Sequence, residues 1–217
     1  MCLLLINSAK FILKLIIRVL IIITIISLIV SVLFPLSYTD YIYKYSLESD
    51  VDPFLVAAII SVESKYQKDA VSKKNARGLM QISAQTGEWG AEVLDISEYN
   101  SNMLFDPETN IRIGTWYLRQ LKNQFNNDID LVLAAYNAGS GNVAKWLKDE
   151  RYSKDEANLN RIPFKETDEY LDKVKFNHTI YKTIYKGYME KPETVHSLYF
   201  DAIMNIRAFL KDLIRPE

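Results

Sequence analysis

Cysteine is nearly absent from this sequence, and histidine, glycine and proline are scarce. The 217 residues include one Cys, two His, seven Gly and six Pro. Because Cys2 has no second cysteine to pair with, an intrachain disulfide is excluded. The histidines, His178 and His196, lie far apart without cysteine partners, so no zinc or other metal site is expected. The scarcity of Gly and Pro, beside abundant Leu, Ile, Lys, Glu and Tyr, favours helix.

The chain also lacks the basic surface that nucleic-acid binding requires. Its formal net charge is −1, from 26 basic and 27 acidic residues. The charges are unevenly distributed, because residues 1–34 carry Lys10, Lys14 and Arg18 and no acid. The remaining chain is therefore acidic on balance, and no nucleic-acid partner is expected.

One long run without charge lies near the N-terminus. Residues 19–34 are uncharged, and residues 15–34, with Arg18 extending towards the headgroups, are long enough to cross a bilayer as a helix. Basic residues precede the run, which predicts residues 1–14 in the cytoplasm and the rest of the chain outside the cell membrane. The alternative is a cleaved signal peptide and secretion, but the following PLSYTDY has no site of small residues. We expect a single-pass anchor.

The rest of the chain reads as helices and loops. Asp52-Pro53 and Asp106-Pro107 each combine a capping side chain with proline at the first helical position. No alternating strand pattern of useful length occurs, so the predicted fold class is an all-α domain over residues 35–190. Gly139 is expected to end its helix in the left-handed conformation. The helices are expected at about 54–64, within 78–89, and at 108–125, 129–139, 142–150 and 167–186.

The segment 191–217 differs in character from the domain before it. Apolar residues recur there at steps of three and four, which predicts an amphipathic helix. Such a helix either packs back on the domain or faces a partner or membrane. The stripe consists of Val195, Leu198, Ala202, Ile206, Phe209 and Leu213.

Glu63 is the strongest candidate for a catalytic residue. Val56, Ile59 or Ile60, and Glu63 are spaced so that the carboxylate lies on the apolar face of its helix, at the last turn. Loss of solvation there should raise the carboxyl pKa, as glycoside cleavage by a general acid requires. Position alone also allows a glutamate that pairs with a lysine or reaches solvent.

Several short motifs follow Glu63-Ser64 in a fixed order. They are Gly78-Leu79-Met80-Gln81-Ile82, Asp106-Pro107-Glu108-Thr109-Asn110-Ile111, Ala135-Tyr136-Asn137-Ala138-Gly139, and Ile162-Pro163-Phe164-Lys165-Glu166-Thr167 with Tyr170. Over residues 40–188 this set resembles the catalytic domain of the soluble lytic transglycosylase (SLT) family, within the lysozyme-like superfamily. The resemblance implies an enzyme that cleaves peptidoglycan glycan strands.

The resemblance also implies roles for individual residues. Glu63 matches the single catalytic carboxylate, and Ser64 the residue that supports it. The implied substrate-binding residues are Ser72, Met80, Gln81, Tyr136, Asn137, Glu166 and Tyr181. Several also have purely structural readings: Tyr136 as a packed aromatic, and Glu166 as an acid favoured at a helix N-terminus.

The implied reaction is non-hydrolytic. Glu63 protonates the oxygen between N-acetylmuramic acid and N-acetylglucosamine, then removes the proton of the muramoyl C6 hydroxyl, leaving a 1,6-anhydromuramoyl end. No cofactor is required, and no protein partner is indicated. A hydrolytic, lysozyme-like muramidase and a catalytically silent glycan-binding scaffold are the alternatives.

Overall fold

The computed structural model describes residues 2–189, with side chains over 10–187. The predicted amphipathic helix at 191–217 lies outside the described residues. The chain divides after Pro35 into two units, and each is described by itself.

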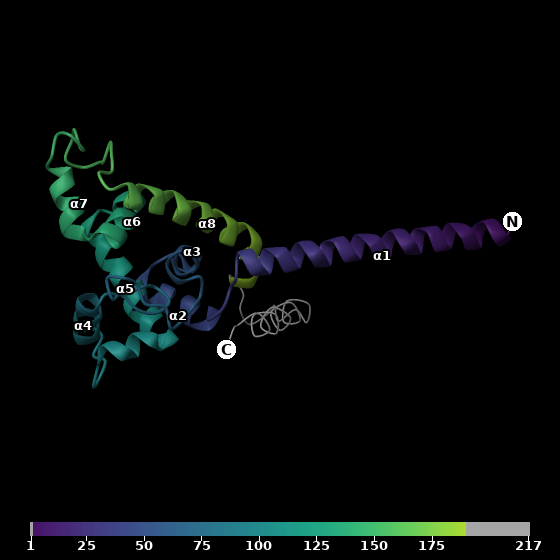
Figure 1. The fold of residues 1–217 in the computed structure, drawn as a ribbon, viewed down its shortest axis with the longest axis horizontal. Helices are drawn as coiled ribbons and strands as arrows, with labels where there is room; N and C mark the ends of the chain where they lie inside the picture. Colours follow the sequence, from purple (N-terminus) through teal and green to yellow (C-terminus); the bar gives the residue numbers. More distant parts are fainter. Residues whose placement is uncertain (1, 190–217) are drawn as a thin grey trace. The chain divides into compact units, whose positions relative to one another are not determined.

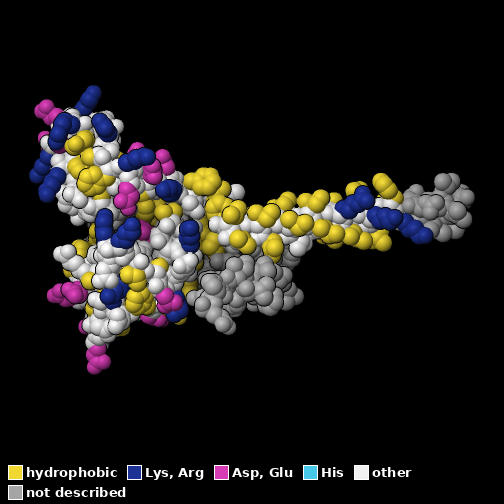
Figure 2. All heavy atoms as spheres, viewed as in Figure 1, with side chains coloured by type: hydrophobic (Ala, Val, Ile, Leu, Met, Phe, Trp, Pro, Cys, Tyr) yellow, Lys and Arg dark blue, Asp and Glu magenta, His cyan; other side chains and the backbone are white. Residues whose placement is uncertain are grey.

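The first unit contains one long helix, α1 (Cys2–Leu33). Its segment Lys10–Leu33 is 24 residues long and apolar enough to cross a membrane. Apolar side chains cover most of its visible surface, with basic residues gathered towards the N-terminal end (Figure 2). A signal sequence near the N-terminus can pass the same test of length and composition, so the uncleaved anchor remains a prediction.

The second unit, which begins at Leu36, consists of helices and loops (Figure 1). Residues 36–189 form no named strand, only two isolated bridges in the segment 71–82. The expectation of an all-α domain is therefore confirmed. Its elements are α2 (Thr39–Ser49), α3 (Pro53–Ser64), α4 (Ala84–Val93), the 3-10 helix η1 (Ser101–Phe105), α5 (Pro107–Gln124), α6 (Ile129–Ala138), α7 (Ser140–Leu147) and α8 (Lys165–Met189).

Aspartate side chains begin three of these helices. Asp52 accepts a hydrogen bond from the Phe54 amide, and Asp106 from the Thr109 amide. Asp128 does the same for α6, where it accepts from two amides. Each satisfies a donor that a helix N-terminus leaves unpaired. The two Asp-Pro start signals in the sequence are thereby confirmed.

Helix α3 is central to the packing of the second unit. Seven consecutive residues, 54–60, are buried, and the helix packs against α2 and α8. Two polar contacts tie it to α8: His178 Nε2 lies 2.8 Å from Asp52 Oδ2, and Ser61 Oγ lies 3.3 Å from Asn177 Oδ1. Helix α5 packs against α2, α4 and α6. Helix α3 is therefore held between α2 and α8, with polar contacts to α8 from both its first and its last turns.

Three features differ from the sequence-based expectations. Helix α2 and the short η1 were not predicted. Gly139 has positive φ, as expected, but its φ of 90° and ψ of 138° lie outside the left-handed helical region. Its amide still caps α6 by donating to Ala135, and α7 begins at the next residue. Gly139 therefore redirects the chain between two helices.

Candidate active site

Glu63 lies in the last turn of α3, where the chain turns sharply. The helix ends at Ser64, and both Lys65 and Tyr66 adopt the left-handed conformation, with φ of 52° and 62°. Tyr66 is buried, and its hydroxyl donates to the carbonyl of Ala57. This turn ends the helix directly after Glu63 and leads the chain into the loop before Gly78.

The surroundings of Glu63 alter its acidity. Its side chain is partly exposed, but protein encloses most of it, and this burial raises the carboxyl pKa from 4.5 to about 7. An interaction with the Tyr170 hydroxyl opposes the rise, and the negative charge of Glu166 adds to it. The Tyr170 hydroxyl is fully buried and makes no hydrogen bond of good geometry, so it is a weak polar neighbour of Glu63. Glu63 can thus hold a proton near neutrality.

Glu63 faces a cleft of about 390 Å³. Polar and charged side chains dominate its lining, with the carboxylates of Glu63 and Glu166 both present. Six of the predicted site residues line this cleft: Glu63, Ser72, Gln81, Tyr136, Asn137 and Glu166. They come from α3, α6, α8 and the loop before α4, so the fold gathers groups up to about one hundred residues apart in sequence.

Asn110 holds one wall of the cleft in place. This fully buried side chain accepts a hydrogen bond from the Met80 amide (2.8 Å) and donates to the carbonyls of Arg77 (2.9 Å) and Leu104 (2.8 Å). Gly78 has a φ of 76°, and a Cβ there would lie 2.1 Å from the Leu104 carbonyl oxygen. Glycine is therefore required at 78. No role for Asn110 was predicted from the sequence, although the motif at 106–111 that contains it was noted.

Gln81 and Ser72 are also engaged within this wall. The Gln81 amide nitrogen donates to the carbonyls of Ala70 (3.1 Å) and Gly78 (2.9 Å). The Gln81 side-chain carbonyl oxygen can therefore accept a hydrogen bond from a ligand in the cleft. Ser72 Oγ accepts from the Ala76 amide at 3.0 Å and stabilises a tight exposed loop. That loop also places Lys73 and Lys74 in the cleft lining, two residues that the sequence analysis missed.

Tyr136 and Asn137 each link the cleft end of α6 to a neighbouring segment through a hydrogen bond. The Tyr136 hydroxyl donates to the Met80 carbonyl at 2.7 Å, and the Thr167 hydroxyl donates to Asn137 Oδ1 at 2.8 Å. Burial, with Glu63 and Tyr117 nearby, raises the pKa of Tyr136 well above its usual range. Tyr136 therefore remains a neutral phenol beside the carboxyl group.

Three predicted residues do not line the cleft. Met80 is fully buried and its sulfur packs on Gly114, where a Cβ would lie only 2.3 Å away. Tyr181 is also fully buried and stacks on Tyr185 at 5.7 Å. Ser64, predicted as a supporting residue, is buried and donates to the Ile60 carbonyl within its own helix. Direct substrate contact by the Met80 and Tyr181 side chains would require them to move.

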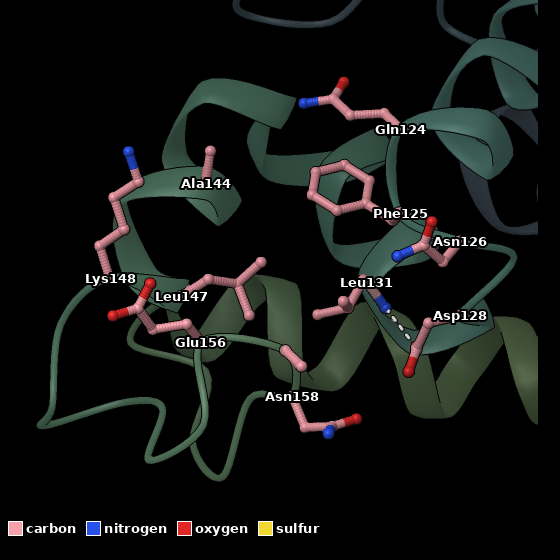
Figure 3. Close-up of a pocket in the computed structure, with 11 residues that line it drawn as sticks. Gln124, Phe125, Asn126, Asp128, Leu131, Ala144, Leu147, Lys148, Glu156 and Asn158 are labelled. Carbon is pink, nitrogen blue, oxygen red and sulfur yellow. Dashed lines mark hydrogen bonds between the residues drawn. The ribbon is translucent and has the colours of Figure 1, made fainter.

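A second cavity, of about 540 Å³, lies at the other end of α6 (Figure 3). It is lined by residues of α5, α6, α7 and the segment 156–158. Its Asp128 already caps α6, as the dashed bond to Leu131 shows. Glu63 is not part of it. Across the described residues, no group of three or more His, Cys, Asp or Glu side chains could hold a metal ion.

Comparison with known sequences agrees with this architecture. A family model, the transglycosylase SLT domain, matches residues 40–160. The soluble lytic murein transglycosylase of Salmonella typhimurium is 36% identical over 166 residues, which are 76% of this chain and 25% of that protein. The membrane-bound lytic murein transglycosylase C of Photorhabdus laumondii is 34% identical over 125 residues, 52% of this chain and 34% of that protein. The chain thus matches a quarter to a third of these relatives' length.

Solved structures give the same result. The lytic transglycosylase Slt of Pseudomonas aeruginosa, solved as an inactive variant with glutamine in place of a glutamate, has a TM-score of 0.63 and 32% identity. The match covers 71% of this chain and 25% of that one. The 70 kDa soluble lytic transglycosylase of Escherichia coli has a TM-score of 0.62 and 36% identity, over 69% of this chain and 25% of that one. The chain belongs to the transglycosylase SLT domain family.

Proposed function

We propose that this protein is a membrane-anchored lytic transglycosylase that cleaves peptidoglycan glycan strands, with Glu63 as its catalytic acid and base. The observation that carries the proposal is a carboxyl group with pKa raised to about 7 in a polar cleft. A group that donates and then accepts a proton works best when its pKa lies near the working pH. The inactive Pseudomonas relative, which lacks one glutamate, supports a dependence on a single carboxyl group.

The proposed first step is proton donation. Glu63 protonates the oxygen between the muramoyl C1 and the N-acetylglucosamine C4, and the bond to C1 breaks. Positive charge develops at C1 and is stabilised by the sugar's own 2-acetamido group. Tyr136 is fixed beside Glu63 through its hydrogen bond to the Met80 carbonyl, so it limits the positions that a sugar or the carboxyl group can take.

The second step uses the same residue as a base. Ionised Glu63 removes the proton of the muramoyl C6 hydroxyl, and the oxygen attacks C1 of the same sugar. A 1,6-anhydro ring forms, Glu63 regains its proton, and no water is consumed. Two-carboxylate glycosidases need a second acid at a set distance. Glu166 is the other carboxylate in the lining, but it is exposed, unlike Glu63.

The products distinguish this route from hydrolysis. Full-length protein in detergent micelles would be incubated with peptidoglycan, and the muropeptides analysed by mass spectrometry before and after borohydride reduction. Products lighter by one water than hydrolytic ones, and resistant to reduction, are expected. Reducible ends would establish a lysozyme-like muramidase instead, and glycan binding without products would indicate a silent scaffold.

We propose that α1 anchors the domain as a single-pass helix with residues 1–14 in the cytoplasm. The apolar length of Lys10–Leu33 and the basic residues at its start support this topology. A tethered domain reaches glycan close to the membrane, which favours local remodelling of the wall. The intact mass of the protein recovered from cell membranes tests the proposed anchor. A mass that lacks the N-terminal segment would mean that a signal peptide is cleaved.

A further inference from the structure

Trp89 is the one tryptophan of the chain that reaches solvent. The sequence contains three tryptophans. Trp116 and Trp146 are 5% and 7% exposed, whereas Trp89, on α4, is 46% exposed. Covering this large exposed aromatic surface with a ligand would be favourable.

The orientation of Trp89 is fixed on its inner side. Its ring meets Trp116 nearly edge-on, with centroids 4.7 Å apart and an interplanar angle of 76°. Helix α4 can approach α5 this closely because residue 90 is glycine: a Cβ there would lie 2.8 Å from Ile113 and 3.1 Å from Trp116. The exposed indole is therefore a rigid surface, which loses little conformational entropy when a ligand binds.

Aromatic rings connect Trp89 to the cleft. Trp89 lies 6.4 Å from Tyr117, and Tyr117 lies 5.7 Å from Tyr136, measured between ring centroids. Tyr136 lines the cleft beside Glu63. The cleft is open and of limited volume, about 390 Å³, so a long polymer bound at Glu63 must continue across the neighbouring surface. On the Tyr136 side, the series of ring contacts through Tyr117 leads from the cleft to Trp89.

We propose that Trp89, supported by Tyr117, forms a distal subsite for an N-acetylated glycan strand, which stacks a sugar ring on the exposed indole. This inference rests on the proposed function. The charges nearby favour a sugar over a lipid surface: Glu88 and Glu92, one residue before Trp89 and three after it, are both exposed. Their carboxylates would repel anionic headgroups, but they leave a neutral sugar free to bind.

Tryptophan fluorescence tests the subsite directly. In full-length protein in detergent micelles, acrylamide should quench Trp89 preferentially, and Trp89→Phe should remove that accessible component. The hexamer of N-acetylglucosamine should protect Trp89 from quenching, whereas the dimer should not. Failure of the hexamer to protect Trp89, at concentrations up to its limit of solubility, overturns the proposal. So does protection by a bilayer of anionic lipid with no glycan present.

Kinetics give an independent readout. Trp89→Ala should raise KM for long glycan strands about tenfold, leave kcat unchanged and leave short fragments unaffected, while Trp89→Phe restores most of the loss. Val93→Ala is the matched control, because Val93 is 56% exposed one turn further along α4. An equal loss for strands of every length, or no loss, contradicts the subsite. If the wild type cleaves nothing, the proposed function fails, and the quenching experiment still decides whether Trp89 binds glycan.

Discussion

Glu63 and Glu166 line the same cleft and differ in their surroundings. Glu63 lies at the end of a buried helix, where protein encloses most of the carboxyl group and raises its pKa to about 7. Glu166 lies in the first turn of α8 and is exposed. The negative charge of Glu166 raises the pKa of Glu63 through electrostatic repulsion. Burial therefore distinguishes the proposed proton donor from a second carboxylate that affects its pKa.

The largest expected difference between the two glutamates is in catalysis. Glu63→Gln should lower the rate of muropeptide release about a thousandfold, because the amide cannot transfer the proton. Glu166→Gln should lower it less than about tenfold, since only one exposed charge in the cleft lining is removed. Rates would be measured on purified peptidoglycan, with thermal unfolding as a check on folding. Equal losses in the two variants would remove the distinction between the glutamates.

The pH dependence should report the raised pKa. In the proposed mechanism cleavage starts from protonated Glu63, so kcat/KM should fall above about pH 7, approaching tenfold per pH unit. The profile would be recorded on one substrate at constant ionic strength. A basic limb that begins near pH 4.5, the ordinary value of a glutamate, would mean that Glu63 is not the acid.

Stability should respond to the same burial. In the unfolded chain Glu63 titrates near 4.5, and in the folded protein near 7. Below pH 4.5 both states hold the proton, so the free energy of unfolding is unaffected. Between these values only the unfolded chain releases it, so stability falls as pH rises, and the full cost, at most about 3 kcal/mol, is present above pH 7.

Glu63→Gln should therefore raise the free energy of unfolding at pH 8 and leave it nearly unchanged at pH 4. Glu150→Gln serves as the control, because this exposed residue should change stability by less than about 0.5 kcal/mol at either pH. Urea unfolding of full-length protein in micelles gives both values. An equal gain at pH 4 and pH 8 would assign the effect to packing.

The smallest expected effects are two opposite shifts of the pH profile. Glu166→Gln removes a nearby negative charge and should move the basic limb to lower pH. Tyr170→Phe removes the hydroxyl that favours ionised Glu63 and should move it to higher pH. Each shift should be at most about one pH unit. Shifts in the same direction would show that the pKa of Glu63 changes because the site repacks, and not because the charge or hydroxyl is removed.

Helix starts could be read from the sequence wherever a side chain marks them. Asp52 and Asp106 cap α3 and α5 and are followed by proline, so both helices were predicted to within a residue or two. Helix α2 was missed because it lacks such a signal: it begins after Tyr38, in the left-handed conformation, without a side-chain cap. Its contacts come from elsewhere in the fold: it packs against α3 and α5, and Tyr45 and Lys44 bond Glu108 of α5.

The candidate site could be predicted where motif and geometry agree. The apolar spacing before Glu63 anticipated its burial, and six of the proposed site residues meet at the cleft. The same motif could not reveal that Met80 points into the core, because that depends on Gly114, which is 34 residues away in sequence. For a similar reason it could not show that Asn110 holds the loop through three hydrogen bonds.

The three hydrogen bonds of Asn110 bear on how tightly the cleft binds its ligand. They fix the Gly78–Met80 wall when the chain folds, so this part of the cleft is already shaped before glycan arrives. A ligand then has little loop entropy to overcome, and its affinity reflects the contacts themselves. Folding and ligand binding can therefore be lost separately. Loss of Asn110 should leave a helical protein that still folds but has lost the shape its ligand requires.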